Sequence, residues 1–184
     1  MNSDLILEFR EDTDPVPQSP IPYNQMELGL KVKIKEHGFI QEDRRFNRTV
    51  YALPGDFVVI KDPGVLDYLR SIRPLSKYRD DWFRMVSSFS DAVEEAKKDV
   101  NSRQLLVLNT HDFKNVHQCF NTFQFVYTHR GEFDLYVYQR SADIVKLKDD
   151  LVFFAAVAKE FEKQVCQKVS KFVITYGHIH YTKE

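Results

Sequence analysis

The stretch "FQFVYTHRGEFDLYVYQRSAD", from Phe123 to Asp143, carries the strongest fold signal in the chain. Apolar and polar side chains alternate on both sides of the turn at 129–132. Alternation with a period of two around a glycine-containing turn predicts a β-hairpin. The second strand runs into Gln139-Arg140-Ser141, with Asp143 close behind. Polar groups therefore gather where this strand ends, which indicates a candidate site.

The regions on either side of the hairpin predict further strands and one long helix. Residues 149–169 form the longest predicted helix, and its first half is apolar on nearly all sides, so we expect it to be buried. The ranges 103–110 and 171–181 predict strands. Strands on both sides of one buried helix predict the α+β class.

The N-terminal part of the chain mixes extended and regular signals. Four prolines among few apolar residues at 11–24 predict an extended arm, so we assign residues 1–24 to the arm and 25–184 to one domain. "LKVKIK" (30–35) alternates as a strand, and residues 51–60 predict a turn and a short buried strand. Helices are expected at 64–72 and 88–100, the second with Ser88 or Ser90 as its N-cap.

The composition excludes several classes of protein. The 184 residues suit one domain, and their 43% apolar content is enough for a sizeable core. Lys and Arg number 26 against 27 Asp and Glu, so the net charge of −1 gives no overall bias towards nucleic acid. Two cysteines form no disulfide framework, which favours a reducing, cytoplasmic setting. The sequence shows neither a signal peptide nor a membrane-spanning apolar run, so we expect no membrane partner.

Cys119 is the candidate nucleophile. A lone cysteine in an apolar context such as "VHQCFNTFQF" is more often an inert core residue, but a neighbouring arginine would stabilise the reactive thiolate. Arg140 ends the paired strand of the hairpin and could supply that charge. Both interpretations stay open on the residues alone. Cys166, within the predicted long helix, is interpreted as structural or surface, with no role.

Several arginines could bind an anion. Arg103 precedes one predicted strand and Arg140 follows another, and Ser141 adds a hydroxyl, so the three could hold a phosphate. Arginines at strand ends are, however, usually solvated. Arg48 clusters with Arg44 and Arg45, which fits a solvated loop and an anion site equally well.

His178 and His180 alternate in the last predicted strand and so share a face. Two histidines at that spacing could begin a metal site, but no third ligand follows at a suitable spacing. Hydrogen bonding to a hydroxyl is the favoured role, and we predict no metal site.

Together these pieces resemble the thymidylate synthase superfamily, which includes the deoxycytidylate hydroxymethylases. The matching stretches, in order, are "NSRQLLVLNTHDF", a cysteine five residues before Gln-Phe, "LYVYQRSAD", a long apolar helix and "GHIHY". "YRDDWFR" also looks like the family's Tyr-x-x-x-Trp-Arg stretch, so the resemblance covers about residues 78–181. It implies a mixed sheet packed around a long buried helix, with two such sheets back to back in a homodimer.

The resemblance implies roles at the nucleophile and the phosphate. Cys119 would be the nucleophile, beside Arg140. Arg140 and Ser141 would hold the 5′-phosphate of a pyrimidine deoxynucleotide, and we add Arg48 from the arginine cluster. Arg103 matches an arginine that crosses the dimer interface to the phosphate of the other subunit.

The resemblance also implies contacts to the base and the sugar. Asp143 and Gln139 fall where the family meets the base, and His180 matches the histidine that bonds the 3′-hydroxyl. Tyr181 lies next to Thr182, where the family has a tyrosine.

Base choice depends on the start of the long helix. One deletion places Asp150 where the family has an asparagine that pairs with uracil, and the cytidylate hydroxymethylases carry aspartate there. A carboxyl group accepts from the N4 amine of cytosine and, when protonated, donates to N3, which favours dCMP over dUMP. Without the deletion Leu151 takes the position, and Asp149-Asp150 is only helix N-terminal charge.

The expected chemistry is transfer of a methyl or hydroxymethyl group to carbon 5. A thiolate that adds at carbon 6 makes carbon 5 nucleophilic towards a one-carbon electrophile. The family's electrophile comes from 5,10-methylenetetrahydrofolate. The chain stops at Glu184, before the segment that closes over the folate in family enzymes, which weakens the expectation that folate binds.

Other departures from the family pattern support a second hypothesis. Phe120 replaces the histidine after the nucleophile, and Gln104 replaces the second arginine of the phosphate pair. The Pro-Phe before the base-reading residue is missing, and the family's catalytic glutamate is not located. The alternative is therefore a catalytically impaired homologue that binds a nucleotide or a partner protein. A further possibility is a subunit whose missing parts come from another chain.

Overall fold

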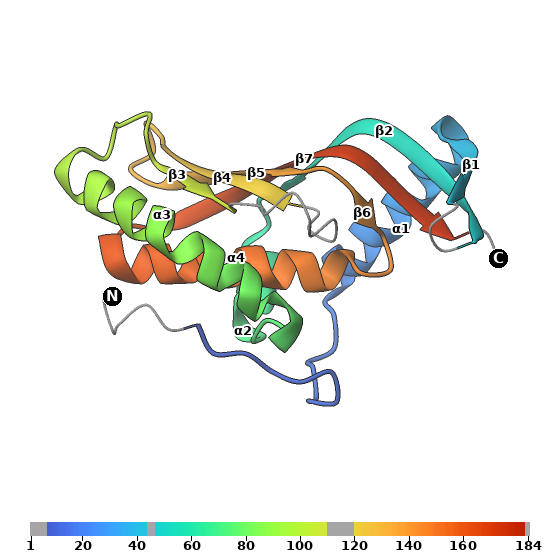
Figure 1. Cartoon of the computed structure of the whole chain (residues 1–184), viewed down its shortest axis with the longest axis horizontal. Coiled ribbons are helices and arrows are strands. Elements are labelled where there is room, and N and C mark those ends of the chain that lie inside the picture. The colour runs from blue at the N-terminus through green and yellow to red at the C-terminus, as the bar shows by residue number, and fades with distance from the viewer. Residues whose placement is uncertain (1–6, 44–46, 110–119, 183–184) are drawn as a thin grey trace.

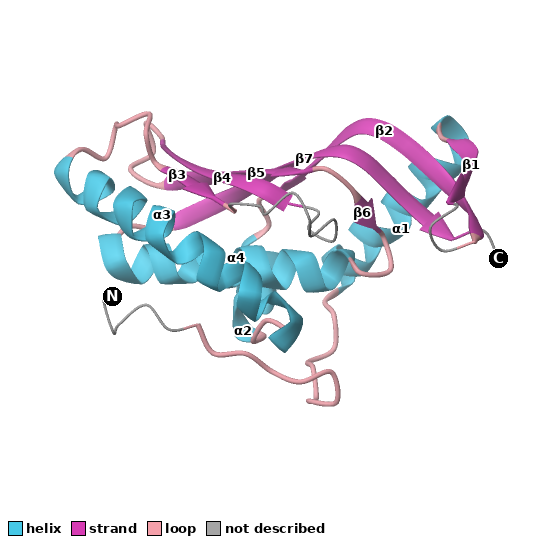
Figure 2. Ribbon diagram, in the orientation of Figure 1, coloured by secondary structure: helices cyan, strands magenta, loops and turns pink. Residues whose placement is uncertain are grey.

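The computed structural model describes residues 7–43, 47–109 and 120–182. Within these residues the strands form a single seven-stranded mixed sheet in the order β1-β2-β7-β5-β4-β3, with β6 paired to β7. The strands are β1 (Phe39–Asp43), β2 (Arg48–Ile60), β3 (Leu106–Leu108), β4 (Phe120–Tyr127), β5 (Phe133–Gln139), β6 (Ala142–Asp143) and β7 (Val169–Thr182). The helices are α1 (Ile21–His37), α2 (Pro63–Ser71), α3 (Arg79–Lys98) and α4 (Leu147–Val165), and α2, α3 and α4 lie below the sheet in Figures 1 and 2.

The predicted hairpin is confirmed. Strands β4 and β5 pair antiparallel, with Phe125 opposite Leu135, and the turn between them places Gly131 at φ 78°. Strand β7 then pairs parallel with β5, so α4 is the crossover helix between them. This β5–α4–β7 unit brings the carboxyl end of β5 to the start of α4, where a crossover unit of this type commonly forms its site.

Helix α4 is the predicted buried helix. Its side chains from Leu151 to Ala155 are almost wholly buried, which explains the apolar first half in the sequence. Phe161 stacks on Phe125 with ring centroids 3.7 Å apart, so the helix is anchored on the hairpin. The helix ends at Val165, earlier than predicted, because Cys166 takes the left-handed conformation (φ 55°) and caps it. Cys166 is exposed.

Two N-terminal predictions are wrong. The segment 30–35, predicted as a strand, belongs to α1, because Leu30 and Ile34 are four residues apart and both face the core. Residues 21–24, predicted as arm, are the first turn of the same helix. Pro22 lies in that turn, where its missing N–H breaks no helical hydrogen bond.

Two further predictions differ from the structure, and one is confirmed. Strand β2 runs unbroken through Pro54 and Gly55, where a turn was expected, because Gly55 takes φ 65° within the strand. Helix α2 forms as predicted, with Asp62 as its N-cap. Helix α3 begins at Arg79 rather than near Ser88, whose hydroxyl bonds the backbone of Leu108 instead of capping a helix.

The sheet face opposite the helices carries apolar side chains in two rows. Paired residues of neighbouring strands share a face, and in one row Val59, Val173, Tyr136, Gln124 and Leu106 follow one another across the sheet. The parallel row is Phe57, Thr175, Tyr138, Thr122 and Leu108. Six of these large apolar residues are at least 38% exposed: Phe57, Val59, Leu106, Leu108, Tyr136 and Tyr138.

Candidate active site

The buried end of β5 meets the first turn of α4 through Gln139 and Asp150. The Gln139 side chain is fully buried, and its Nε2 donates to Asp150 Oδ2 at 2.7 Å and to the Ser141 carbonyl at 3.2 Å. Leu151, the other residue considered for this position, is fully buried in the core. Asp150 is therefore the one that faces the end of β5.

Tyr78 completes this contact from a third element. Its hydroxyl donates to Asp150 Oδ1, and its ring stacks on Phe153 at 4.9 Å between centroids. Burial raises the pKa of Asp150 from 3.8 to about 6, although the bonds from Tyr78 and Gln139 and the charge of Lys77 act to lower it. Burial and the Asp150 charge raise the pKa of Tyr78, so its hydroxyl stays protonated and remains a donor.

Two more buried tyrosines lie around this carboxyl. Tyr176 is the in-register neighbour of Gln139 on β7, and Tyr23 comes from α1. Burial raises the pKa of both tyrosines, and the Asp150 charge adds to the shift. Within the described residues neither hydroxyl has a hydrogen-bond partner, and neither does Gln139 Oε1. Three buried polar atoms near Asp150 are thus left for a bound molecule or water.

A second polar cluster lies along β6, β7 and the start of β2. Arg48 donates from Nη1 to Asp143 Oδ2 at 3.2 Å and to Thr182 Oγ1 at 2.9 Å. Its Nη2 lies 3.3 Å from His180 Nε2. Asp143 and His180 are brought together because β6 pairs with β7 at this point. The structure therefore groups three of the predicted site residues, and a polar hollow that includes Arg48 opens beside them.

Of the residues predicted to bind the phosphate, Arg140 and Ser141 lie apart from Arg103. Arg140 is exposed directly after β5, and Ser141 is partly buried. Gly177 on β7 passes close to them: a Cβ atom there would lie 2.9 Å from the Arg140 carbonyl oxygen. Arg103 is exposed and precedes β3. Nearby, the Leu105 carbonyl accepts from the Phe125 amide, close to one end of β4. Gln139, which precedes Arg140, pairs with Phe120 at the other end of β4. Within one chain Arg103 is thus away from Arg140.

The remaining predicted residues have mixed outcomes. Cys119 lies outside the described residues. Tyr181 stacks on Tyr51 at 5.2 Å, and its buried hydroxyl has no partner in the described part of the chain. The rings of His178 and His180 lie 5.2 Å apart on one face, as the alternation predicted. Over 7–43, 47–109 and 120–182, no group of three or more His, Cys, Asp or Glu side chains could hold a metal ion. None of the described helices could cross a membrane.

Sequence reasoning missed the tyrosines of the site. The sequence indicates Tyr78 only within "YRDDWFR" and gives no signal for Tyr23 or Tyr176. Their signal is weak, because tyrosine is common in strands and cores and only the fold brings these three near one carboxyl.

Comparison with known proteins identifies the fold. No family model matches this chain. A search of curated proteins finds no match either. Among solved structures, thymidylate synthase from phage T4 matches with a TM-score of 0.64 and 15% identity, over 85% of this chain and 76% of that one. At that identity the likeness shows the fold alone, so the chain has a thymidylate synthase-like fold.

Proposed function

We propose that this protein binds a pyrimidine deoxynucleoside monophosphate where β5 meets α4 and transfers a one-carbon unit to carbon 5 of its base. The observation that carries this proposal is the contact of Gln139 and Tyr78 with the Asp150 carboxyl. Around it, buried polar atoms without partners are suited to a planar polar ligand. Cys119, next in sequence to Phe120, would supply the thiolate.

Asp150 supports a preference for dCMP. A carboxyl group with a pKa near 6 exchanges its proton close to neutral pH. It can accept from the N4 amine of cytosine and, when protonated, donate to N3. Gln139 and Tyr78 each occupy one acceptor position on its two oxygens, and a carboxylate has about four such positions, so capacity for a base remains.

The phosphate would be held by Arg140, Ser141 and Arg48. An arginine binds phosphate through charge-assisted, often paired hydrogen bonds. Arg48 now pairs with Asp143, so binding would exchange a carboxylate for a phosphate. Asp143, His180 and Tyr181 would lie on the base and sugar side. Arg103 would contribute to the phosphate site of a second subunit.

A homodimer fits this arrangement. The two apolar rows on the open face of the sheet offer a surface for another copy of the same sheet. The one-carbon donor would be 5,10-methylenetetrahydrofolate, as the fold family implies. The described contacts identify no residues that hold a folate.

Release of tritium from carbon 5 tests the proposal. Addition of the Cys119 thiolate at carbon 6 labilises the hydrogen at carbon 5, so labelled dCMP should lose tritium faster than labelled dUMP. Cys119→Ala should abolish the release, and Cys166→Ala, at an exposed cysteine, should leave it unchanged. No release from either nucleotide, with the cysteines kept reduced, would refute the enzymatic proposal.

The second candidate is a nucleotide-binding or partner-binding homologue without turnover. Phe120 and Gln104, which replace a histidine and an arginine of the family pattern, favour it. Calorimetry with dCMP and dUMP separates the two candidates. Binding that survives Cys119→Ala, combined with no tritium release from the wild-type protein, would support the binding homologue.

A further inference from the structure

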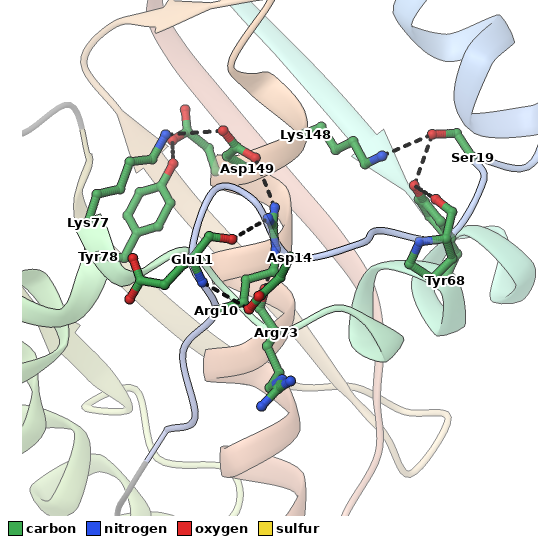
Figure 3. Close-up of polar contacts among 12 residues, drawn as sticks. Arg10, Glu11, Asp14, Ser19, Tyr68, Arg73, Lys77, Tyr78, Lys148 and Asp149 are labelled. Atoms are coloured by element: carbon green, nitrogen blue, oxygen red, sulfur yellow. Dashed lines mark hydrogen bonds and ion pairs between the residues drawn. The ribbon is translucent and has the colours of Figure 1, made fainter.

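Residues 7–20 form an N-terminal strap that crosses the start of α4. Figure 1 shows this segment running past the helices on the side away from the sheet. Leu7, Phe9 and Val16 pack against the core, so the strap is seated rather than loosely attached. Figure 3 shows its polar side chains meeting those of α2, α4 and the turn before α3.

Arg10 is the main anchor of the strap. Its side chain is 9% exposed, which is rare for arginine unless its charge and donors are paired. Nε donates to the Arg73 carbonyl at 3.0 Å, and Nη2 lies 3.6 Å from Asp149 Oδ1. The Arg10 backbone adds two bonds of 2.8 Å, donating to the Pro74 carbonyl and accepting from the Ser76 amide. Arg10 therefore fixes the turn at 73–76.

That turn leads directly into the candidate site. Ser76–Tyr78 forms a single 3₁₀ turn, and Lys77 Nζ donates to Asp149 Oδ2 at 3.1 Å. The next residue, Tyr78, donates to Asp150. The Asp149 carboxylate thus pairs with Arg10 and Lys77, while the neighbouring Asp150 carboxyl accepts a hydrogen bond from Tyr78. The strap, the turn and the first turn of α4 form one connected group.

The other end of the strap also contacts the start of α4. Ser19 Oγ accepts from Lys148 Nζ at 3.2 Å and lies 2.9 Å from the Tyr68 hydroxyl. That hydroxyl donates to the Pro17 carbonyl at 3.2 Å. Lys148 and Asp149, the two residues before Asp150, are therefore each tied to a different end of the strap.

We infer that Arg10 is a positioning residue for the candidate site: by fixing the 73–76 turn and Asp149, it holds Tyr78 against Asp150. The inference deepens the proposed function, because it assigns the N-terminal strap to the site that binds the base. Its contacts do not depend on which nucleotide binds, so it can be tested without one.

The charges around Asp150 set the direction of the expected effect. The groups that face it are Lys77 and Tyr78 from the turn, Asp149 from its own helix, Gln139 from β5, Tyr176 from β7 and Tyr23 from α1. Removing Arg10 leaves the Asp149 charge less neutralised, and that charge raises the pKa of Asp150. Loosening Tyr78 removes a bond that lowers it. Both effects raise the pKa of Asp150.

The experiment is a carbon-13 NMR titration of the Asp150 carboxyl in the protein without ligand. Arg10→Ala should raise the titration midpoint by about half a pH unit or more. Arg10→Lys should raise it less, because the charge near Asp149 is kept while the forked donor is lost. Arg73→Ala is the matched control: its side chain is 60% exposed and 3.8 Å from Glu8, so the midpoint should not move.

A folded Arg10→Ala protein that titrates at the wild-type midpoint would overturn the inference. If that variant does not fold, Arg10→Gln decides the question, because its amide can still donate to the Arg73 carbonyl while the charge is gone. Its midpoint should also rise, and an unchanged midpoint overturns the inference. Failure of the tritium assay leaves this result unaffected, so the two proposals fail separately.

Discussion

At the scale of single residues, Asp150 holds the site together. It accepts from Gln139 on β5 and from Tyr78 before α3, so it joins segments 11 and 72 residues away in sequence. The sequence left two choices for this position, Asp150 and Leu151, because a one-residue gap cannot be placed from pattern alone. The helix resolves the choice physically: Leu151 turns into the core and Asp150 turns to the end of β5.

The raised pKa of Asp150 predicts a pH dependence of stability. Its folded pKa, about 6, exceeds the ordinary 3.8, so the folded state binds this proton more tightly than the unfolded state. The stabilisation is complete below about pH 4 and is lost as the pH rises through about 6. The difference in unfolding free energy between wild type and Asp150→Asn should fall by on the order of 3 kcal/mol over this range. Urea unfolding at several pH values measures it, and a flat difference would contradict the assignment.

Arg140 should affect two properties at once. If it binds phosphate and stabilises the Cys119 thiolate, Arg140→Ala should weaken nucleotide binding by about 1.5–3 kcal/mol and slow alkylation of that thiol near neutral pH. Arg140→Lys should restore much of the alkylation rate but less of the affinity, because lysine lacks the planar fork. Arg103→Ala should weaken binding only. If Arg140→Ala keeps the wild-type nucleotide affinity and alkylation rate, the end of β5 is only a solvated surface without a binding role.

At the scale of elements, the hairpin and the buried helix were predictable, and α1 was not. The hairpin has strict alternation, and α4 has an apolar face too wide for a surface helix. "LKVKIK" alternates just as strictly, yet it is helical, because Leu30 and Ile34 also satisfy a four-residue spacing and Val32 is left 44% exposed. Lysine at every second position is compatible with a strand and with a helix, so only packing against β2 distinguishes the two structures.

Gly177 allows β7 to pass close to the end of β5, because it has no side chain. A Cβ atom there would lie 2.9 Å from the Arg140 carbonyl oxygen and 3.1 Å from the Tyr138 hydroxyl. Gly177→Ala should therefore destabilise the fold by about 1–3 kcal/mol and also weaken nucleotide binding. Gly29→Ala, in α1 with nothing within 4 Å of its Cβ position, should stabilise the protein by up to about 1 kcal/mol. Chemical unfolding compares the two, and equal effects would contradict the close approach.

At the scale of the whole molecule, the open face of the sheet predicts a dimer. The two rows run across β2, β7, β5, β4 and β3, and six of their ten residues, on β2, β5 and β3, are exposed large apolar side chains. Monomers rarely leave such an apolar face in water. Light scattering at micromolar concentration should give twice the 21.7 kDa chain mass. Tyr136→Asp should give a monomer. Phe83→Asp, a matched change at a 65% exposed residue of α3, should leave the dimer intact. If the wild-type protein is a monomer, the dimer prediction is wrong and Arg103 does not belong to the site.

Calorimetry with dCMP and dUMP at pH 6 tests whether the Asp150 carboxyl reads a pyrimidine base. The wild-type protein should bind dCMP more tightly than dUMP, and this preference should weaken as the pH rises above about 6, because the carboxyl loses the proton that it donates to N3. Asp150→Asn should reverse the preference, since its amide can pair with O4 and N3–H of uracil, with a swing of roughly 1–3 kcal/mol. If neither nucleotide binds, or if Asp150→Asn leaves the ratio of the two affinities unchanged, the Asp150 carboxyl does not read the base.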